Sequence, residues 1–328
     1  MTPPPIDVRR ATGADRDAIV SLAGDALGWD PAAPNAELFA WKHDRSPFGP
    51  SPMWVATVDG ELAGFRTFLR WRWRLPSGEV LGAVRAVDTA THPDHRGRGI
   101  FRTLTMGAVD EMFDEGVDLV FNTPNDQSRP GYLTMGWQVV GTVPVAVAVR
   151  SPLAAARMLR ARVPAEKWSL DTTCGDPADQ VVNDTEAIAT LLTRVPRARG
   201  WRTDRTPEFL RWRYADGPLR YRVLLRTGRT EDGLVVFRLR RRGGAVEATI
   251  CDVIVPAGDR FGTHHLLRRV ARATRADYLI RVQHDVLGPG WSVTLPGQGP
   301  LLTWRPLRHT AAPTIDTWDL RLGDIELF

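Results

Sequence analysis

The sequence of 328 residues contains little cysteine and no long hydrophobic run. Its two cysteines, Cys174 and Cys251, lie far apart and outside any C-x-x-C pair, so they predict neither a disulfide framework nor a zinc site. No apolar stretch approaches the ~18 residues that a membrane span requires. The proline-containing start, Met1–Pro5, lacks the basic and apolar regions of a signal peptide. We therefore expect a cytoplasmic protein with reduced thiols and no membrane partner.

A strong charge imbalance is also missing, because 43 Lys and Arg residues face 38 Asp and Glu residues. The net charge of +5 suits an anionic ligand, whereas a dedicated nucleic-acid binder usually has a more clustered basic face. Nucleic acid is therefore not the expected partner. His92 and His95 stand three residues apart without a third candidate ligand, so no metal site is predicted. The 43% of hydrophobic residues is enough to bury a core, which excludes a disordered chain.

The stretch His92–Phe101 is the first that indicates chemistry. An apolar run typical of a strand, Ala83–Ala90, precedes it, and a helical pattern that ends near Gly116 follows it. A helix start exposes unpaired backbone N–H groups and a partial positive charge, so it attracts anions. Glycines at 97 and 99 would let this backbone approach a phosphate closely, and the arginines at 96 and 98 add full charges. This loop predicts a cradle for a diphosphate.

Strands and helices are predicted to alternate around this loop. The expected strands are 6–10, 54–58, 62–75, 83–90, 118–121 and 139–149, and the expected helices begin at Thr12, Ala36 and Phe101. In the strand 62–75, Trp71 and Trp73 alternate with arginines. We interpret this as a half-buried strand with tryptophans inside and arginines outside, in preference to a nucleic-acid stacking surface.

The second half of the chain repeats the order of the first. Glu208–Arg213 resembles Glu37–Lys42, and a strand, a turn and a returning strand follow in both halves. An internal repeat of this length predicts two copies of one α/β unit. The second copy has Gly258–Gly262 in place of the arginine-glycine loop, and its Asp259 would repel phosphate, so this copy is degenerate. We predict units at 1–150 and 183–328 joined by a connector at 151–182.

The first half resembles the GNAT (Gcn5-related) N-acyltransferase family. Arg96–Phe101 follows the family pattern Arg/Gln-x-x-Gly-x-Gly/Ala between a strand and a helix, except that Phe101 replaces the usual small residue. Asn125, Tyr132 and the pair Gly136–Trp137 also have the family spacing. The resemblance covers roughly residues 5 to 150, and the second half resembles the non-catalytic copy of tandem GNAT proteins. It implies an α/β (α+β) fold in which each unit is a mixed, mostly antiparallel twisted sheet flanked by helices.

The resemblance also implies a cofactor, acetyl-CoA or another acyl-CoA. Its diphosphate would be held by the backbone N–H groups of five loop residues, and Asn125 would contact the cofactor or orient the next loop. The pantetheine would pair with the edge of the preceding strand where that strand splays from its neighbour. The loop residues are Arg96, Gly97, Arg98, Gly99 and Ile100, and the edge residues are Thr89, Ala90 and Thr91.

Acyl transfer to an amine requires a neutral amine, a polarised thioester carbonyl and a protonated leaving thiolate. The resemblance places Tyr132 as the general acid for the sulfur. Asp88, on the central strand, is the first candidate for the general base, and Asp126, His92 or a chain of waters are alternatives. In some relatives the C-terminal carboxylate reaches the active site. Unchanged activity after removal of Phe328 would exclude that role here.

The sequence does not identify the acceptor. Aromatic residues with a few carboxylates would suit an amino sugar or another small amine. A tRNA-dependent aminoacyl transferase of the tandem type is an alternative, and it would hold RNA with a basic surface that includes Arg238, Arg240, Arg241 and Arg242. A non-catalytic acyl-CoA-binding or sensing protein is another. Whether the chain forms a homo-oligomer stays open.

Overall fold

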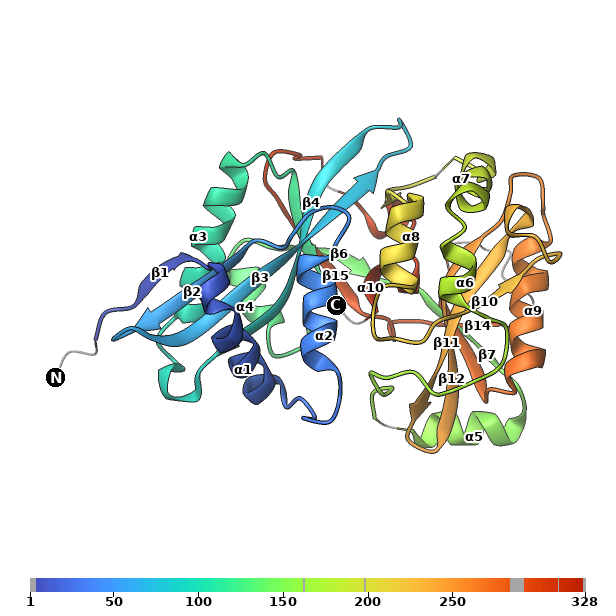
Figure 1. The fold of residues 1–328 in the computed structure, drawn as a ribbon, viewed down its shortest axis with the longest axis horizontal. Helices are drawn as coiled ribbons and strands as arrows, with labels where there is room; N and C mark the ends of the chain where they lie inside the picture. The colour runs from blue at the N-terminus through green and yellow to red at the C-terminus, as the bar shows by residue number, and fades with distance from the viewer. Residues whose placement is uncertain (1–3, 162, 198, 284–291, 312, 327–328) are drawn as a thin grey trace.

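The protein consists of two β-sheets that stand side by side, each flanked by helices (Figure 1). This computed structural model describes residues 4–161, 163–197, 199–283, 292–311 and 313–326. Most neighbouring strands within each sheet run antiparallel, and the exceptions are the parallel pairs β4–β5 and β12–β13. The predicted α/β fold with two such sheets is therefore confirmed.

The first sheet has the strand order β1-β2-β3-β4-β5-β15-β6, and β9 pairs with β3 outside this path. Its strands are β1 (Asp7–Arg10), β2 (Met53–Val58), β3 (Glu61–Arg74), β4 (Val80–Thr91), β5 (Leu119–Asn122), β6 (Gln138–Thr142), β9 (Arg202–Thr203) and β15 (Leu301–Pro306). Its helices are α1 (Arg16–Leu27), α2 (Asn35–Asp44), α3 (Ile100–Asp114) and α4 (Arg129–Thr134). Of these helices, α4 was not predicted from the sequence.

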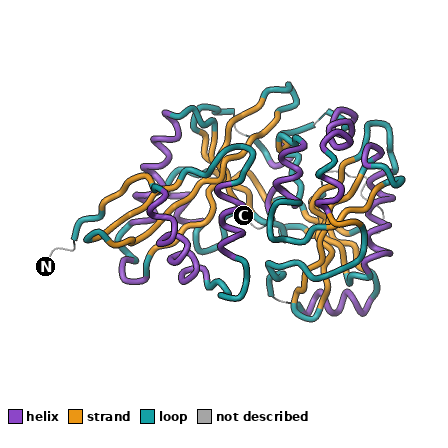
Figure 2. The backbone as a smooth tube through the Cα atoms, viewed as in Figure 1, coloured by secondary structure: helices purple, strands orange, loops and turns teal. Residues whose placement is uncertain are grey.

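The second sheet has the strand order β14-β7-β13-β12-β11-β10-β8. Its strands are β7 (Val145–Val149), β8 (Asp176–Pro177), β10 (Arg222–Leu225), β11 (Leu234–Arg242), β12 (Ala245–Ile254), β13 (Tyr278–Val282) and β14 (Val293–Leu295). The remaining helices, visible with the others in Figure 2, are α5 (Pro152–Arg160), α6 (Ala178–Val182), α7 (Thr185–Arg194), α8 (Pro207–Tyr214), α9 (Gly262–Thr274) and α10 (Leu322–Ile325).

The two sheets exchange strands. The valine-rich segment predicted as one strand, 139–149, is divided by Pro144 into β6 in the first sheet and β7 in the second. Conversely, β15 comes from the second half of the chain and lies between β5 and β6. The predicted ranges 1–150 and 183–328 therefore each contain a strand of the other sheet, and the connector 151–182 contributes β8 to the second sheet.

One core joins both halves of the molecule. It contains aromatic residues of both predicted units, including Trp71 and Trp73 from β3, which are 1% and 0% exposed. Arg72 between them is exposed, so the predicted alternation on this strand is confirmed. The sequence also predicts a strand-like end at 318–328, and the structure differs from this prediction. Residues 322–325 form the short helix α10, and all four of its residues are buried.

Candidate active site

The glycine loop has the geometry that the sequence predicts. Gly97 and Gly99 have φ values of +75° and +77°, in the left-handed region that only glycine adopts without strain. A Cβ atom at either position would meet nothing within 4 Å, so the space above the backbone is open. Gly99 is the N-cap of α3, and Ile100 is the first residue of the helix. Arg96 is exposed, whereas Arg98 is partly buried and donates to the carbonyl of Pro4.

The strand that leads into this loop has a free edge. β4 pairs with β3 along its length, but its other edge pairs with β5 only at Ala83–Arg85. Among the described residues, no strand covers that edge at 86–91, which includes Thr89, Ala90 and Thr91. Backbone N–H and C=O groups on such an edge are available to an extended ligand. The predicted splay between this strand and its neighbour is therefore present.

Asp88 forms a bulge within this free edge. Arg66 of β3 pairs with Thr89 and Thr67 pairs with Val87, so Asp88 is left without a partner in the register. Its φ is +36°, which is unusual for a residue with a Cβ atom. Strained backbone of this kind concentrates at functional sites, because the surrounding structure must hold it in place.

The carboxylate of Asp88 is bound by two residues of α2. Its Oδ2 atom accepts a hydrogen bond from Lys42 Nζ at 2.6 Å and lies 2.8 Å from His43 Nε2. Burial alone would raise the pKa of Asp88, but Lys42 and His43 hold it well below its usual range. A general base needs a pKa near the working pH. Asp88 is therefore a fixed anion at neutral pH, which disfavours its predicted role as the proton acceptor.

His43 completes this cluster. Burial lowers its pKa, despite the opposing effect of Asp88, so its ring is neutral at neutral pH. Since a carboxylate only accepts, a neutral His43 donates from Nε2 to Asp88, and its Nδ1 accepts from the Ser51 hydroxyl at 2.9 Å. Lys167, from the predicted connector, donates to Asn35 of α2 at 2.6 Å. Burial lowers the pKa of Lys167, and Lys42 lowers it further.

Tyr132 lies in α4 and is 3% exposed. Its phenol oxygen accepts a hydrogen bond from Arg66 Nη2 at 2.5 Å. Its ring packs edge-on against Phe101, with 5.4 Å between the ring centroids. The side chain of Phe101 is thus used to hold Tyr132, which explains why a large residue is tolerated in the first turn of α3.

Three other predicted residues, Asn125, Asp126 and His92, lie outside the buried cluster around Asp88. Asn125 Oδ1 accepts hydrogen bonds from the backbone N–H and the hydroxyl of Ser128, both at 2.9 Å, and so shapes the turn into α4. Asp126 has 91% of its side chain exposed and pairs with Arg129 at 3.2 Å. The side chain of His92 is 44% exposed. Neither alternative base therefore shares the buried surroundings of Asp88.

In the second half, the carboxylate of Asp259 occupies the space at the corresponding helix start. A Cβ atom at Gly262, the first residue of α9, would lie 2.4 Å from the carboxylate of Asp259. Arg226 also donates to this carboxylate, at 3.0 Å. An internal anion therefore occupies the helix start where an external phosphate would bind. The position of Asp259 agrees with the prediction that the second copy is degenerate.

The last described residues pack between the two halves. Burial alone would raise the pKa of Glu326, but Arg238 and Arg213 lower it to about 2. Arg238 is 0% exposed, so it belongs to this internal cluster and not to the basic surface that the tRNA-dependent alternative would require. Arg85 of β4 donates to the carbonyl of Asp324 at 2.7 Å. The predicted role of Phe328 lies outside the described residues.

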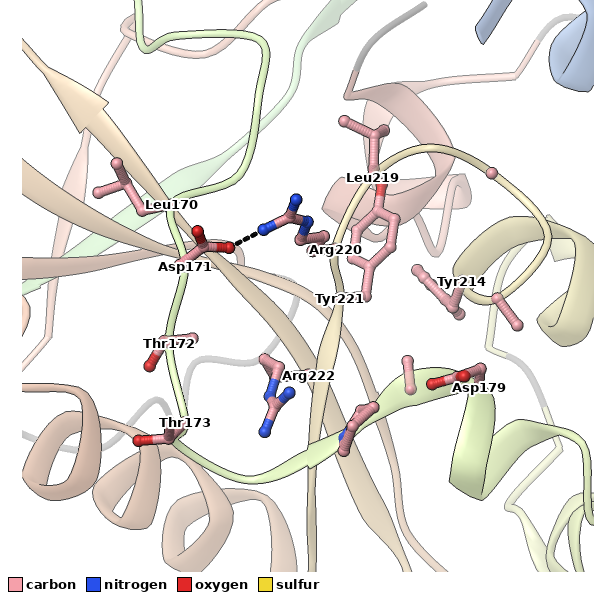
Figure 3. Close-up of a pocket in the computed structure, with 14 residues that line it drawn as sticks. Leu170, Asp171, Thr172, Thr173, Asp179, Tyr214, Leu219, Arg220, Tyr221 and Arg222 are labelled. Carbon is pink, nitrogen blue, oxygen red and sulfur yellow. Dashed lines mark hydrogen bonds and ion pairs between the residues drawn. The ribbon is translucent and has the colours of Figure 1, made fainter. Parts of the chain in front are cut away.

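A cavity of about 780 Å³ lies in the second half. Figure 3 shows it between the segment Leu170–Thr173, the ion pair of Asp171 with Arg220, and the rings of Tyr214 and Tyr221. Tyr221 donates to Glu326 at 3.0 Å. Tyr221 thus links the wall of the cavity to the C-terminal cluster, and the glycine loop does not line the cavity.

Sequence reasoning missed four residues of this site: Lys42, His43, Arg66 and Lys167. Lys42 and His43 could have been noticed as two polar residues that end a predicted helix, whereas nothing near Arg66 or Lys167 indicates a role. In the described part of the chain, no group of three or more metal-ligating side chains is found. None of the described helices is long and apolar enough to cross a membrane.

The comparison with known proteins agrees with this geometry. Residues 7–140 match the family model for the acetyltransferase (GNAT) domain. A GCN5-related N-acetyltransferase from Anabaena variabilis has a TM-score of 0.64 at 12% identity, over 92% of this chain and 73% of that chain. A probable N-acyltransferase from Enterococcus faecalis has a TM-score of 0.62 at 13% identity, over 93% and 73% of the two chains.

A GCN5-related N-acetyltransferase from Kribbella flavida has a TM-score of 0.58 at 14% identity, over 93% of this chain and 72% of that chain. At such identities the likeness shows the fold alone. Among curated protein sequences no relative is found. The domain match, which coincides with the glycine loop and the free edge of β4, shows that the chain contains a GNAT-family acetyltransferase domain at residues 7–140 and is an acyltransferase.

Proposed function

We propose that the protein transfers the acetyl group of acetyl-CoA to the amine of a small molecule, by direct attack within a ternary complex. The observation that carries this proposal is the free edge of β4, which leads from the bulge at Asp88 to the open glycine loop. Acetyl-CoA combines a diphosphate with an extended amide-containing arm. The loop and the edge offer the donors that these two parts need.

The chain's own residues fit each part of this cofactor. Gly97 and Gly99 leave open space above the N-terminus of α3, where a diphosphate would meet unpaired N–H groups and the helix dipole. Thr89, Ala90 and Thr91 offer a backbone edge for the pantetheine amides. When bound, acetyl-CoA supplies an activated acyl group on sulfur. Tyr132 would then give its phenol proton to that sulfur as it leaves.

The charges near Asp88 bear on the acceptor. Two lysines, Lys42 and Lys167, lie near the single carboxylate of Asp88, so basic side chains outnumber acidic ones in this cluster when His43 is neutral. A positive surrounding disfavours the ammonium form of an incoming amine and favours its neutral, nucleophilic form. This electrostatic effect would assist deprotonation where Asp88 cannot serve as the base, with water taking the proton.

The test is acetyl-CoA binding followed by turnover. We expect acetyl-CoA to raise the thermal unfolding temperature, and a panel of small amines, including amino sugars, to contain one that releases free CoA thiol. Tyr132→Phe should lower kcat about 10²- to 10⁴-fold, the range for loss of a general acid, with little change in acetyl-CoA binding. The absence of a thermal shift at millimolar acetyl-CoA would contradict the proposal.

The two alternatives give different outcomes. Binding without turnover across a wide amine panel would favour a non-catalytic acyl-CoA-binding protein. A tRNA-dependent transferase would need a basic surface, but Arg238 is buried against Glu326 and Arg240 is paired with Glu247 at 2.5 Å. Because Arg238 is fully buried and only 17% of the Arg240 side chain is exposed, the small-amine acceptor is the preferred proposal.

A further inference from the structure

Arg66 is a fully buried cation beside the predicted general acid. It lies on β3, opposite the cofactor edge, and pairs in register with Thr89 of β4. Its guanidinium carbon lies 4.8 Å, 5.4 Å and 5.3 Å from the ring centroids of Phe68, Phe101 and Tyr132. These rings hold the guanidinium in place, and the resulting position is one that solvent does not reach.

Two of the three guanidinium nitrogens have no hydrogen-bond partner. Nη2 donates to Tyr132, but Nε and Nη1 are buried without an acceptor among the described residues. Aromatic faces attract a cation, yet they do not replace an oxygen acceptor for each N–H group. Buried donors are nearly always paired in folded proteins, because an unpaired one is costly. The arrangement therefore indicates an acceptor that arrives with a ligand.

The bond to Tyr132 also fixes the direction of the phenol proton. Arginine can only donate, so the phenol oxygen must accept from Nη2. The hydrogen of Tyr132 consequently points away from Arg66 and stays available to a second acceptor. A thioester sulfur that receives this hydrogen would bring its carbonyl oxygen, two bonds away, close to the remaining donors of the same planar guanidinium.

We infer that Arg66 binds the thioester carbonyl oxygen of the acyl-CoA through one of its unpaired N–H groups, while it positions Tyr132 through Nη2. This inference rests on the proposed function. Arg66 would polarise the carbonyl as the amine nitrogen forms its bond to the carbonyl carbon. The carbon–sulfur bond then breaks, Tyr132 protonates the sulfur, the proton of the amine passes to water, and the phenol regains a proton from solvent.

The discriminating experiment compares acetyl-CoA with CoA, because only acetyl-CoA has a thioester carbonyl. We expect the wild-type protein to bind acetyl-CoA about tenfold or more tightly than CoA in calorimetry without an acceptor, as a charged hydrogen bond would provide. In Arg66→Met this preference should disappear while CoA affinity stays the same. Arg66→Lys, which keeps a cationic donor, should recover part of the preference. Arg72→Met, on the same strand but exposed, is the matched control.

Thermal unfolding and kinetics complete the test. Arg66→Met should keep or raise the unfolding temperature of the ligand-free protein, since it removes unpaired buried donors. The kcat losses of Arg66→Met and Tyr132→Phe should not multiply in the double variant, because the two residues act as a unit.

Three outcomes would overturn the inference. Equal losses of CoA and acetyl-CoA affinity in Arg66→Met would show a general role in the fold of the site. A marked drop in the unfolding temperature of that ligand-free variant would show that Arg66 is a structural clamp for the three rings. If the wild-type protein binds neither ligand, the proposed function itself is wrong, and the inference fails with it.

Discussion

The indole rings of Trp41 and Trp212 stack on each other, and each ring donates its N–H group to the main-chain carbonyl of the other residue. The ring centroids are 4.9 Å apart with 16° between the planes, and the two hydrogen bonds measure 2.6 Å and 3.0 Å. Trp41 belongs to α2 and Trp212 to α8, the two helices that carry the repeated sequence. Equivalent residues of the two halves thus make a reciprocal contact, as a local two-fold relation requires.

Trp41→Phe and Trp212→Phe should each destabilise the protein by about 2–4 kcal/mol, because each removes buried ring volume and leaves a carbonyl without its donor. The double variant should cost less than the sum of the two single variants, since both remove the same contact. Guanidinium unfolding of the four proteins measures this coupling. Strictly additive losses would show that the two residues contribute independently.

Gly99→Ala and Gly258→Ala form a matched pair of variants in the two loops. Both glycines have positive φ values, +77° and +95°, and both have open space where a Cβ atom would lie. The backbone strain, about 1 kcal/mol, should therefore be similar in the two variants. Only Gly99→Ala should weaken acetyl-CoA binding, because it alone alters the predicted diphosphate cradle. Equal effects on binding would place the cofactor elsewhere.

Asp88→Asn should destabilise the protein by about 3–5 kcal/mol, because it removes the anion that faces the buried Lys42. The control is Asp126→Asn, whose exposed ion pair with Arg129 should contribute less than about 1 kcal/mol. Urea unfolding at pH 7 measures both. A change of similar size in the two variants would contradict the view that Asp88 is a structural anion of the site.

The stability of the protein should fall as the pH decreases below about 6.5, the usual pKa of histidine. Burial lowers the pKa of His43 in the folded protein, so in this window the unfolded chain binds a proton that the folded chain does not. The slope from this residue is at most about 1.4 kcal/mol per pH unit. Urea unfolding at pH 7.5, 6.5 and 5.5 measures it, and His43→Gln should show a smaller slope than the wild-type protein.

Carboxylates titrate in a different range. Asp88 and Glu326 have lowered pKa values in the folded protein, so their contribution is complete above about pH 4.5 and is lost only below it. A decrease in stability between pH 7.5 and 5.5 that is the same in the wild-type protein and in His43→Gln would therefore contradict the assignment to His43.

Phe101→Gly should lower kcat by removing the ring that holds Tyr132 edge-on. Because the family pattern has a small residue at this position, Phe101→Gly should leave CoA affinity unchanged or improve it. The structure adds that the ring also touches the position of Gly131, where a Cβ atom would lie 3.3 Å from it. Phe101→Leu, which keeps apolar volume, should retain more activity than Phe101→Gly. Full activity in Phe101→Gly would show that Tyr132 needs no support from this ring.

The loop could be predicted because its chemistry is local. Glycine at 97 and 99, a strand before them and a helix after them are properties of consecutive residues, and the structure has them in that order. The burial of Trp71 and Trp73 and the exposure of Arg72 between them could also be predicted, because successive side chains of a strand point to opposite faces. The degenerate second loop was recognised from the single aspartate at 259.

The partners of Asp88 and Tyr132 could not be predicted, because they come from distant segments. Lys42 lies 46 positions from Asp88, and Arg66 lies 66 positions from Tyr132. The bulge at Asp88 results from the register in which β3 pairs with β4. This register cannot be predicted from the sequence of either strand alone. The helix α4 was missed because Pro130 and Gly131 indicate a turn, although proline is favoured at the start of a helix.

Because β7 and β15 are exchanged between the sheets, a fragment that contains only one half of the chain would lack a strand of its own sheet. A fragment that ends near residue 150 would expose the apolar strand Val145–Val149 with no sheet to join, and its first sheet would have a gap where β15 belongs. Such an unpaired apolar strand is a template for aggregation. We therefore expect the two sheets to unfold as one cooperative unit, because the sheet beside the glycine loop is incomplete without a strand from the half that lacks such a loop.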